Sequence, residues 1–470
     1  MCGVSVIYTD AYIVPIAEKK HYSNQNWCHS GAHISLNVAD SIYACVGEIY
    51  NREKLCSVYN ITNDKSVSHI LDTIHNQTET DEFFLGRRIK NLCSVLDGEF
   101  ALFYGTKNHL VVARDPLGVR SLYYGMLEDR IVGFASEAKQ FLHNIKLDTV
   151  KQFPPGQVWM IDKVSRHVIK LDFSALTYPL HTDTLHKPNT YAAIRTMLHH
   201  AVKKRITEQP IGFLLSGGLD SSILATIASG IMAPDRITTY YMNVKGCVST
   251  DMIYARNVAK HLNTEHIEIT VEASDIPKVI ESLETFDSST ISSAVPMFKL
   301  FEEIAKIGKH KVVISGDGAN ELFGGYLYLH NAPSASMFQE ETISLLRNMH
   351  KFDLLRADRC SSAHGIEIRM PFLDHKLVEY VTHLDANEKI PSFIRMEKMI
   401  LRKSFDGFLP FDVLYRQHSN MNSSWFNDAK NNSEEELMYS NIYNNYYSSV
   451  KSQSNIWKPK WSLPGFVRDQ

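Results

Sequence analysis

The sequence predicts two folds in succession: a strand-rich α+β part, followed by an α/β part built on a parallel sheet. In residues 1–160, short β-branched runs are separated by turn signals, and few helices are apparent. Beyond residue 190, apolar strands alternate with amphipathic helices, as in a parallel sheet covered by helices on both faces. Between the two parts, residues 171–190 contain two prolines and no periodicity, which is typical of a linker.

The first part is expected to form a domain over residues 2–170. Its expected strands are apolar runs at residues 2–8, Ser41–Val46, Phe100–Tyr104, Leu110–Ala113 and Leu122–Tyr124. Turn-forming pairs such as Asp97-Gly98 lie between these runs, and the clearest helix spans Val67–Ile74.

The second part, residues 191–470, opens with a helix that has one apolar face, formed by Tyr191, Ile194, Leu198, Val202 and Ile206. The strands expected after it are Ile211–Leu215, Ile237–Asn243, His266–Ile269 and Lys311–Ser315. The helices expected between them are one that ends at Ala228, Asp251–Leu262 and Val295–Ile307. After residue 419 the chain is rich in Asn, Ser and Tyr, which predicts a loosely ordered tail with short helices.

The composition is that of an ordinary globular protein. Of the 470 residues, 44% are hydrophobic and 21% charged, and the net charge of -3 favours neither nucleic acid nor an anionic membrane as a partner. The seven cysteines form no CxxC pair, so we expect no disulfide framework and no zinc site, and a reducing, cytoplasmic location fits best. No apolar stretch approaches the ~18 residues of a membrane span, and no secretory signal pattern is expected.

The strongest motif is Ser216-Gly217-Gly218-Leu219-Asp220-Ser221-Ser222, between an apolar strand and a helix. The two glycines let the backbone approach an anion closely, and amides at a helix N-terminus donate hydrogen bonds to phosphate. Asp220 would repel phosphate directly, so its useful role is that of a magnesium ligand. A plain glycine turn, with Ser and Asp as helix caps, is the alternative interpretation.

This string resembles the pyrophosphate loop of the ATP pyrophosphatases, which split ATP into AMP and pyrophosphate to activate an acid. The resemblance continues, in order, through Ser315–Tyr326, Gly365–Asp374 and Met396–Arg402. Together these segments look like the synthetase domain of glutamine-dependent asparagine synthetase, which has an adenine nucleotide alpha hydrolase-like sheet. Within the second of them, Glu367 and Arg369 are expected to form a structural pair.

The resemblance implies that the second domain uses ATP and Mg²⁺. Carried over by position, it assigns ATP binding to Leu214, Ser216, Gly217, Gly218, Asp220, Ser221, Met242, Ser315 and Gly316. It places Asp317 at the acyl-adenylate step, and it gives Asp220 and Asn320 as metal ligands. Lys398 matches the family lysine near the phosphates, where it can neutralise charge on the leaving pyrophosphate. Without this motif context, Lys398 would be taken for a solvated helix lysine.

Cys2 is the candidate nucleophile of the first domain. Removal of Met1 would leave an α-amine, with a pKa of about 8, beside the thiol, and this amine can act as the base. The thiol can then attack the amide of glutamine, form a thioester and release ammonia. The alternative is an ordinary buried cysteine in a first strand.

The other segments of this domain resemble the N-terminal-nucleophile amidotransferases. The matching stretches are Gly47–Asn51, Leu96–Ala101, Arg114–Gly118, Ala135–Lys139 and Phe153–Gly156. The resemblance implies an αββα sandwich of the N-terminal nucleophile hydrolase type, and it implies that Gly47 and Glu48 bind glutamine. It also implies an internal tunnel that carries ammonia to the second site.

Several ligand-binding positions depart from the family. Val46 stands where the family has an asparagine that stabilises the oxyanion, and residues 1–51 contain no arginine for the glutamine carboxylate. The segment Ser66–His69 lacks the aspartate that would bind the substrate amine. One lost oxyanion donor costs about 2.7–4 kcal/mol of transition-state stabilisation, so we expect glutamine hydrolysis to be weak or absent. In the second site, Ser292 replaces an arginine and Asn320 an aspartate, so ATP binding is better supported than aspartate specificity.

Four functions remain open at this point. The first is an asparagine synthetase that converts aspartate, ATP and glutamine or ammonia to asparagine, AMP and pyrophosphate through β-aspartyl-AMP. The second keeps only the ammonia-dependent half, and the third is a related ATP-pyrophosphatase that forms an amide on another acid. The fourth is a nucleotide-binding protein without catalysis. Family members are often dimers, so a homodimer is expected.

Overall fold

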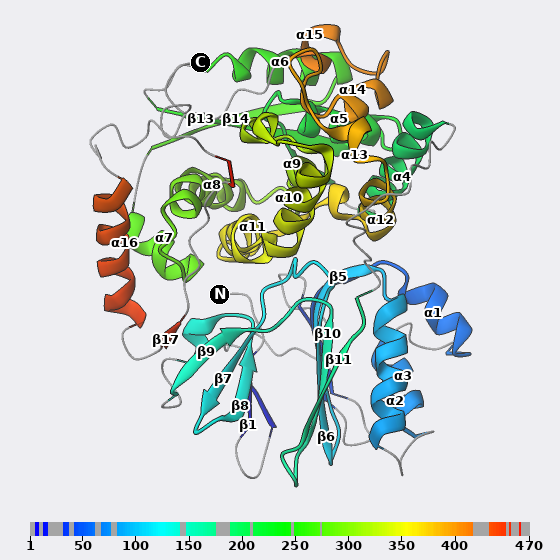
Figure 1. Ribbon diagram of the computed structural model, residues 1–470, viewed down its shortest axis with the longest axis vertical. Coiled ribbons are helices and arrows are strands. Elements are labelled where there is room, and N and C mark those ends of the chain that lie inside the picture. Colours follow the sequence, from blue (N-terminus) through cyan, green and yellow to red (C-terminus); the bar gives the residue numbers. More distant parts are fainter. Residues whose placement is uncertain are drawn as a thin grey trace. The chain divides into compact units, whose positions relative to one another are not determined.

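Three β-sheets organise the part of the chain that the structure describes (Figure 1). The computed structural model describes residues 5–8, 13–16, 32–36, 42–61, 67–76, 82–141, 147–174, 189–206, 210–245, 249–272, 275–416, 432–447, 451–452 and 460–461. The chain divides into two compact units. Unit 1 comprises Met1–Ala175, Ile280–Phe286 and Leu437–Ser454, and unit 2 comprises Leu176–Val279, Asp287–Glu436 and Asn455–Gln470. The domain limits given by the sequence stay a prediction.

Unit 1 contains two six-stranded sheets, with the orders β17-β9-β7-β8-β1-β2 and β11-β10-β6-β5-β4-β3. Neighbouring strands are antiparallel, except that β17 runs parallel to β9. The strands are β1 (Ser5–Tyr8), β2 (Ile13–Ile16), β3 (Ala32–Leu36), β4 (Ile42–Ile49), β5 (Gly98–Gly105), β6 (His109–Arg114), β7 (Tyr123–Leu127), β8 (Arg130–Ala135), β9 (Thr149–Gln152), β10 (Gln157–Asp162), β11 (Val168–Asp172) and β17 (Lys451–Ser452). The helices are α1 (Arg52–Val58), α2 (Val67–Asn76), α3 (Glu82–Val95) and the short η1 (Ala138–Phe141).

Side chains of the second sheet alternate between two apolar cores, as the two-residue repeat of a strand requires. In β4, Val46 packs into a core between the sheets, together with Phe134 of β8. Its neighbour Cys45 faces the opposite core, beneath α2 and α3. On the outer face of the first sheet, Phe141 of η1 packs with Tyr123 of β7. These layers confirm the αββα sandwich predicted for the first part.

Unit 2 is built on a five-stranded parallel sheet with the order β14-β13-β12-β15-β16, which confirms the predicted α/β fold. The strands are β12 (Ile211–Leu214), β13 (Ile237–Val244), β14 (Glu265–Val271), β15 (Val312–Ile314) and β16 (Glu367–Arg369). In Figure 1, α6 (Asp251–Leu262) lies on one side of β13 and β14, and α8 (Ser288–Ile307) lies on the other. The predicted pair in β16 is confirmed, because Arg369 Nε donates to Glu367 Oε1 over 2.7 Å.

The remaining helices of unit 2 connect and flank these strands. They are α4 (Thr190–Arg205), α5 (Leu219–Ser229), η2 (Pro234–Arg236), α9 (Ala319–Phe323), η3 (Leu327–Asn331), α10 (Ala335–Asn348), η4 (Met349–Lys351), α11 (Asp353–Ser362), η5 (Pro371–Leu373), α12 (His375–Thr382), α13 (Ala386–Lys389), α14 (Met399–Ser404) and α15 (Phe411–Leu414). The helices α7 (Ile276–Leu283) and α16 (Asn432–Tyr447) each run from one unit into the other.

Two of the predicted elements are wrong in extent. The helix expected from Val295 begins at Ser288, because the carboxylate of Asp287 caps it by accepting a 2.7 Å hydrogen bond from the Thr290 amide. The short helices expected in the tail are a single helix, α16, over residues 432–447. Its buried face consists of tyrosines at four-residue spacing, Tyr439, Tyr443 and Tyr447, which the Asn- and Ser-rich composition hides.

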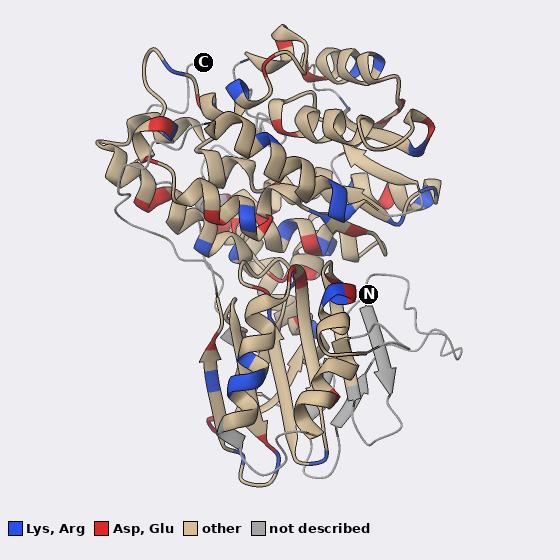
Figure 2. Cartoon of the chain, turned by 90° about the vertical axis from the view of Figure 1, so that its right-hand side faces the viewer, with Lys and Arg blue, Asp and Glu red and all other residues tan. Residues whose placement is uncertain are grey.

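Acidic and basic residues are interspersed along the elements of both units, in keeping with the net charge of -3 (Figure 2). Among the described residues, no helix has both the length and the apolar character needed to cross a bilayer.

Candidate active site

The turns that follow β12 and β15 meet at one edge of the parallel sheet. These two strands are neighbours, yet the chain visits β13 and β14 on one side of β12 before it returns to β15 on the other. At such a reversal of strand order, the carboxyl ends of the strands leave the crevice in which α/β sheets bind ligands. Both glycine turns picked out by the sequence, residues 216–218 and 315–318, lie here.

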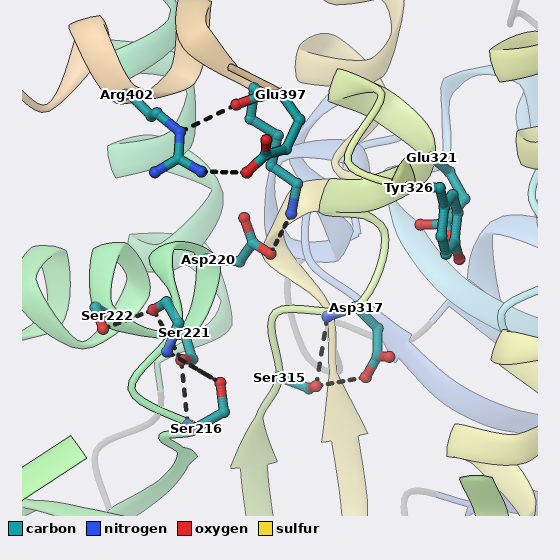
Figure 3. A network of polar contacts seen from close by, with 12 residues as sticks. Ser216, Asp220, Ser221, Ser222, Ser315, Asp317, Glu321, Tyr326, Glu397 and Arg402 are labelled. Carbon is teal, nitrogen blue, oxygen red and sulfur yellow. Dashed lines mark hydrogen bonds and ion pairs between the residues drawn. The ribbon is translucent and has the colours of Figure 1, made fainter. Parts of the chain in front are cut away.

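Glycine and serine shape the first turn (Figure 3). Gly217 has a φ of +77°, and a Cβ atom on it would lie 2.5 Å from the carbonyl oxygen of Asp251 in α6. The hydroxyl oxygens of Ser216 and Ser221 lie 3.1 Å apart, and the Gly218 amide donates to Ser216 Oγ over 3.3 Å. Gly218 precedes α5 without making a side-chain cap, so amides of the first helical turn are available to an anion.

The second turn packs against the first. A Cβ atom on Gly316 would lie 3.2 Å from Asp220 Cβ, so glycine lets the two turns touch. Beside it, the Ser315 hydroxyl donates to Asp317 Oδ2 over 2.5 Å. Arg356 of α11 donates to the other oxygen, Oδ1, over 3.1 Å. Both oxygens of Asp317 are thereby held in place.

A buried ion pair joins the first turn to the start of α14 (Figure 3). Lys398 directly precedes α14, is 2% exposed, and donates from Nζ to Asp220 Oδ2 over 2.6 Å. The adjacent residue is held by Arg402, which donates to the carboxylate of Glu397 over 2.6 Å and to the Leu414 carbonyl over 2.6 Å. The polypeptide around the lysine is therefore fixed, and its ammonium group is directed to the turn.

Two buried oxygen atoms near this pair have no hydrogen-bond partner in the described part of the chain, namely Asp220 Oδ1 and Asn320 Oδ1. A Cβ atom on Gly325 would lie 2.0 Å from Lys398 Cε and 2.3 Å from Asn320 Oδ1, so both side chains surround this glycine. Carboxylate and amide oxygens suit Mg²⁺, which keeps several waters and binds phosphate. Among the described residues no cluster of three or more His, Cys, Asp and Glu could hold a metal, so these two oxygens fit a partly hydrated ion.

A chain of hydrogen bonds leads from Asp317 to a buried glutamate. Arg356 donates from Nη1 to Asp353 Oδ1 over 2.7 Å. The Tyr326 hydroxyl lies 3.3 Å from Asp353 Oδ2 and is also hydrogen-bonded to Glu321 Oε1. Burial, followed by the nearby Asp353, raises the pKa of Glu321 to about 8.

Sequence reasoning assigned no role to these four network residues. Glu321 and Tyr326 lie inside the motif Ser315–Tyr326, where a role could have been sought. Asp353 and Arg356 lie on α11 and have no local signal, because only the fold brings that helix to the second turn.

Comparison with known proteins gives the family of the chain. The profile described as Asparagine synthase matches residues 193–344 and 331–454, and the profile described as Glutamine amidotransferase domain matches residues 34–143. The chain is 33% identical over 442 residues to the "Probable asparagine synthetase (glutamine-hydrolyzing)" of Acanthamoeba polyphaga mimivirus, with 87% of this chain and 78% of that protein covered. The chain belongs to the asparagine synthetase family.

Cellular relatives of the same name show similar identity. The "Asparagine synthetase (glutamine-hydrolyzing)" of Gallus gallus is 32% identical over 479 residues, with 88% of this chain and 83% of that protein covered. The corresponding protein 1 of Saccharomyces cerevisiae is 34% identical over 463 residues, with 86% and 77% covered.

The structure brings most of the predicted residues of the synthetase site together. Around the two turns and the ion pair lie Ser216, Gly217, Gly218, Asp220, Ser221, Ser315, Gly316, Asp317, Asn320 and Lys398. Leu214 and Met242 lie toward the carboxyl ends of the paired strands β12 and β13, and both are half-buried. The roles of these residues in ATP, metal and acid binding stay predictions.

The residues predicted to bind glutamine lie at the end of β4. Gly47 has a φ of +103°, and a Cβ atom on it would lie 1.9 Å from the Glu99 carbonyl oxygen, so only glycine fits. Glu48 accepts a hydrogen bond from Arg52 Nη1 over 3.3 Å. Arg120 lies on the other side, with Nε 3.0 Å from the place of that Cβ atom. Sequence reasoning looked for an arginine only near the N-terminus and missed this buried one.

Two further predictions concern the first domain. The side chain of Val46 packs in the apolar core between the sheets and supplies no hydrogen-bond donor. Cys2, the candidate nucleophile, lies outside the described residues, as does Ser66.

Proposed function

We propose that this chain is an ATP-dependent asparagine synthetase. It adenylates the side-chain carboxylate of aspartate and transfers ammonia, taken from glutamine, to the β-aspartyl-AMP, with release of AMP and pyrophosphate. The proposal is supported above all by the amide-lined turn at the strand reversal, where Lys398 reaches Asp220. The relatives of that name, at 32–34% identity over most of the chain, give the chemistry.

The first turn is the proposed seat of the β- and γ-phosphates of ATP. Amides of the first turn of α5 and the hydroxyl of Ser216 donate to phosphate oxygens, and helix N-termini favour such anions. Lys398 then neutralises the charge that builds on the leaving pyrophosphate. Mg²⁺, held by Asp220 and Asn320, would screen the phosphate charge when it is bound.

The second turn is the proposed seat of the acyl group. Attack of ammonia on the acyl-adenylate forms the carbon–nitrogen bond, expels AMP and leaves one proton to be accepted. The carboxylate of Asp317 is fixed at this turn by Ser315 and Arg356, so it is the proposed acceptor of that proton.

A second candidate, synthesis from free ammonia, is favoured by one observation in unit 1. Val46 turns into the apolar core at the position where a donor to the glutamine oxyanion is needed. Loss of one such donor lowers turnover by about 10²–10³-fold. Ser292, half-buried on α8, likewise leaves open a different acid from aspartate.

The test is a stoichiometric assay of the purified chain with ATP, Mg²⁺ and aspartate, with either glutamine or ammonium as nitrogen source. We expect equimolar asparagine and pyrophosphate with ammonium, and turnover about 100-fold slower with glutamine. A Cys2→Ala variant should abolish only the glutamine-dependent reaction. ATP binding without pyrophosphate release in either mixture would contradict the proposal and indicate another acid or a binding protein.

We also propose that the enzyme works in the cytoplasm. The cysteines that the structure describes, Cys45, Cys56, Cys93 and Cys360, are all buried free thiols, as expected in a reducing compartment.

A further inference from the structure

Two carboxyl groups in unit 2 contact the same phenol. The Tyr326 hydroxyl is hydrogen-bonded to Glu321 Oε1 and lies 3.3 Å from Asp353 Oδ2. A phenol has a single proton to donate, and an ionised carboxylate can only accept. If both carboxyl groups were ionised, one of them would face the phenol oxygen with no proton between them. One of the two carboxyl groups therefore carries a proton.

The surroundings of the two groups decide which one carries it. Asp353 accepts a 2.7 Å hydrogen bond from Arg356, and its side chain is 29% exposed, so its charged form is paired and solvated. Glu321 is 3% exposed, and no cation contributes to its electrostatic surroundings. Burial without a cation disfavours the charged form of a carboxyl group. The proton therefore belongs on Glu321.

We propose that Glu321 is a positioning residue of the acyl-transfer site, which acts as a neutral carboxylic acid. It donates to the Tyr326 oxygen, Tyr326 donates to Asp353, and Asp353 holds Arg356 against Asp317. Glu321 does not itself touch Asp317, so it acts only through this chain of contacts. The role of Asp317 rests on the proposed function, whereas the proton on Glu321 rests on geometry alone.

The proton gives the site a defined pH dependence. The charged and titratable groups that face Glu321 are Asp317 before α9, Tyr326 after it, Tyr328 of η3, and Asp353 and Arg356 of α11. Because the pKa of Glu321 is raised to about 8, it is neutral below that value and ionises above it. Ionisation places a second negative charge beside Asp353, so the network is intact at neutral pH and breaks as the pH rises through about 8.

Infrared spectroscopy of the full chain tests the protonation directly. We expect the carbonyl stretch of a buried carboxylic acid at neutral pH, lost on titration through about 8 and absent from Glu321→Gln. The matched control is Glu367→Gln, a buried glutamate paired with Arg369 over 2.7 Å, which should keep the band. A band that persists in Glu321→Gln, or no band in the unaltered chain, would overturn the proposal whether or not the chain makes asparagine.

Kinetics with ammonium test the positioning role. Glu321→Gln keeps a donor to Tyr326, so its kcat at neutral pH should stay within about twofold of the unaltered chain and lose the alkaline decline. Tyr326→Phe and Glu321→Ala should each lower kcat by about tenfold while the KM for ATP is unchanged. Thermal unfolding of each variant shows that it is folded. If Glu321→Gln loses as much activity as Glu321→Ala, or keeps the alkaline decline, Glu321 has no such role.

Discussion

Lys398 and Asp220 form an ion pair in which Nζ lies 2.6 Å from Oδ2, at the mouth of the turn assigned to phosphate. The lysine side chain is 2% exposed and the aspartate side chain 18%. The second oxygen of the aspartate has no hydrogen-bond partner among the described residues. The pair therefore presents a cation for phosphate and a free oxygen for a metal ion at the same place.

Replacement of the lysine should be the most damaging change at the synthetase site. Lys398→Met removes the only charge of the pair that can meet the pyrophosphate, so pyrophosphate release should fall by about 10²–10³-fold. The control is Lys403→Met, an exposed lysine of the same helix, which should keep normal turnover. Turnover of Lys398→Met within a few-fold of the unaltered chain would remove Lys398 from the mechanism.

Two glycines with similar backbone angles separate strain from steric fit. Gly217 and Gly407 have φ of +77° and +79°, but only at Gly217 would a Cβ atom meet backbone, 2.5 Å from the Asp251 oxygen. Both alanine variants should lose about 1–2 kcal/mol of unfolding free energy from the left-handed angle. Calorimetric ATP affinity should fall at least tenfold for Gly217→Ala only, because α6 must move. Equal affinities of the two variants would contradict the proposed phosphate turn.

Asn320 should set the magnesium requirement. Asn320→Asp restores a charged oxygen beside Asp220 Oδ1, and added ligand charge strengthens divalent binding, here by about tenfold. The readout is the Mg²⁺ concentration that half-saturates calorimetric ATP binding, which needs no turnover. The control is the exposed Asn387→Asp, which should leave this concentration unchanged. No shift for Asn320→Asp would place the metal elsewhere.

A buried lysine should make the stability of unit 2 depend on pH. Lys389 Nζ donates to Gln339 Oε1 over 2.7 Å and to the Val381 carbonyl over 2.8 Å, which suits an uncharged amine with two protons to donate. Burial lowers its pKa to about 7, against the nearby Asp385 and Glu388, which raise it. From about 7 to the ordinary value of 10.5 the unfolded chain holds a proton that the folded chain lacks, so stability rises with pH.

Chemical denaturation across this range measures the effect. The unaltered chain should gain up to about 1.4 kcal/mol per pH unit relative to Lys389→Met, which lacks the titrating group. Parallel pH profiles for the two proteins would show that Lys389 is charged when folded.

The synthetase turns could be predicted from the sequence because each is a contiguous string between a strand and a helix. Gly217 and Gly316 announce close backbone contacts that side-chain spacing alone suggests. The network beyond Asp317 could not be predicted in this way. It depends on α11, whose Asp353 and Arg356 approach the turn only after the helices pack.

The same distinction applies to the fold. The strand at β4 was visible because apolar residues fill both of its faces, as in Cys45 and Val46. The helix α3 was not predicted, because Gly86, Arg87 and Arg88 interrupt its apolar pattern, although Leu85 and Ile89 lie in the core. Its helical state is set by packing on the sheet rather than by local preference.

Adenylation of an acid at the first turn is tested most directly by following oxygen. Aspartate labelled with heavy oxygen in its side-chain carboxylate is incubated with the chain, ATP, Mg²⁺ and ammonium, and the products are analysed by mass spectrometry. We predict one labelled oxygen in AMP and none in pyrophosphate, because the carboxylate attacks the α-phosphorus. Label in inorganic phosphate with formation of ADP, or AMP without label, would contradict the account.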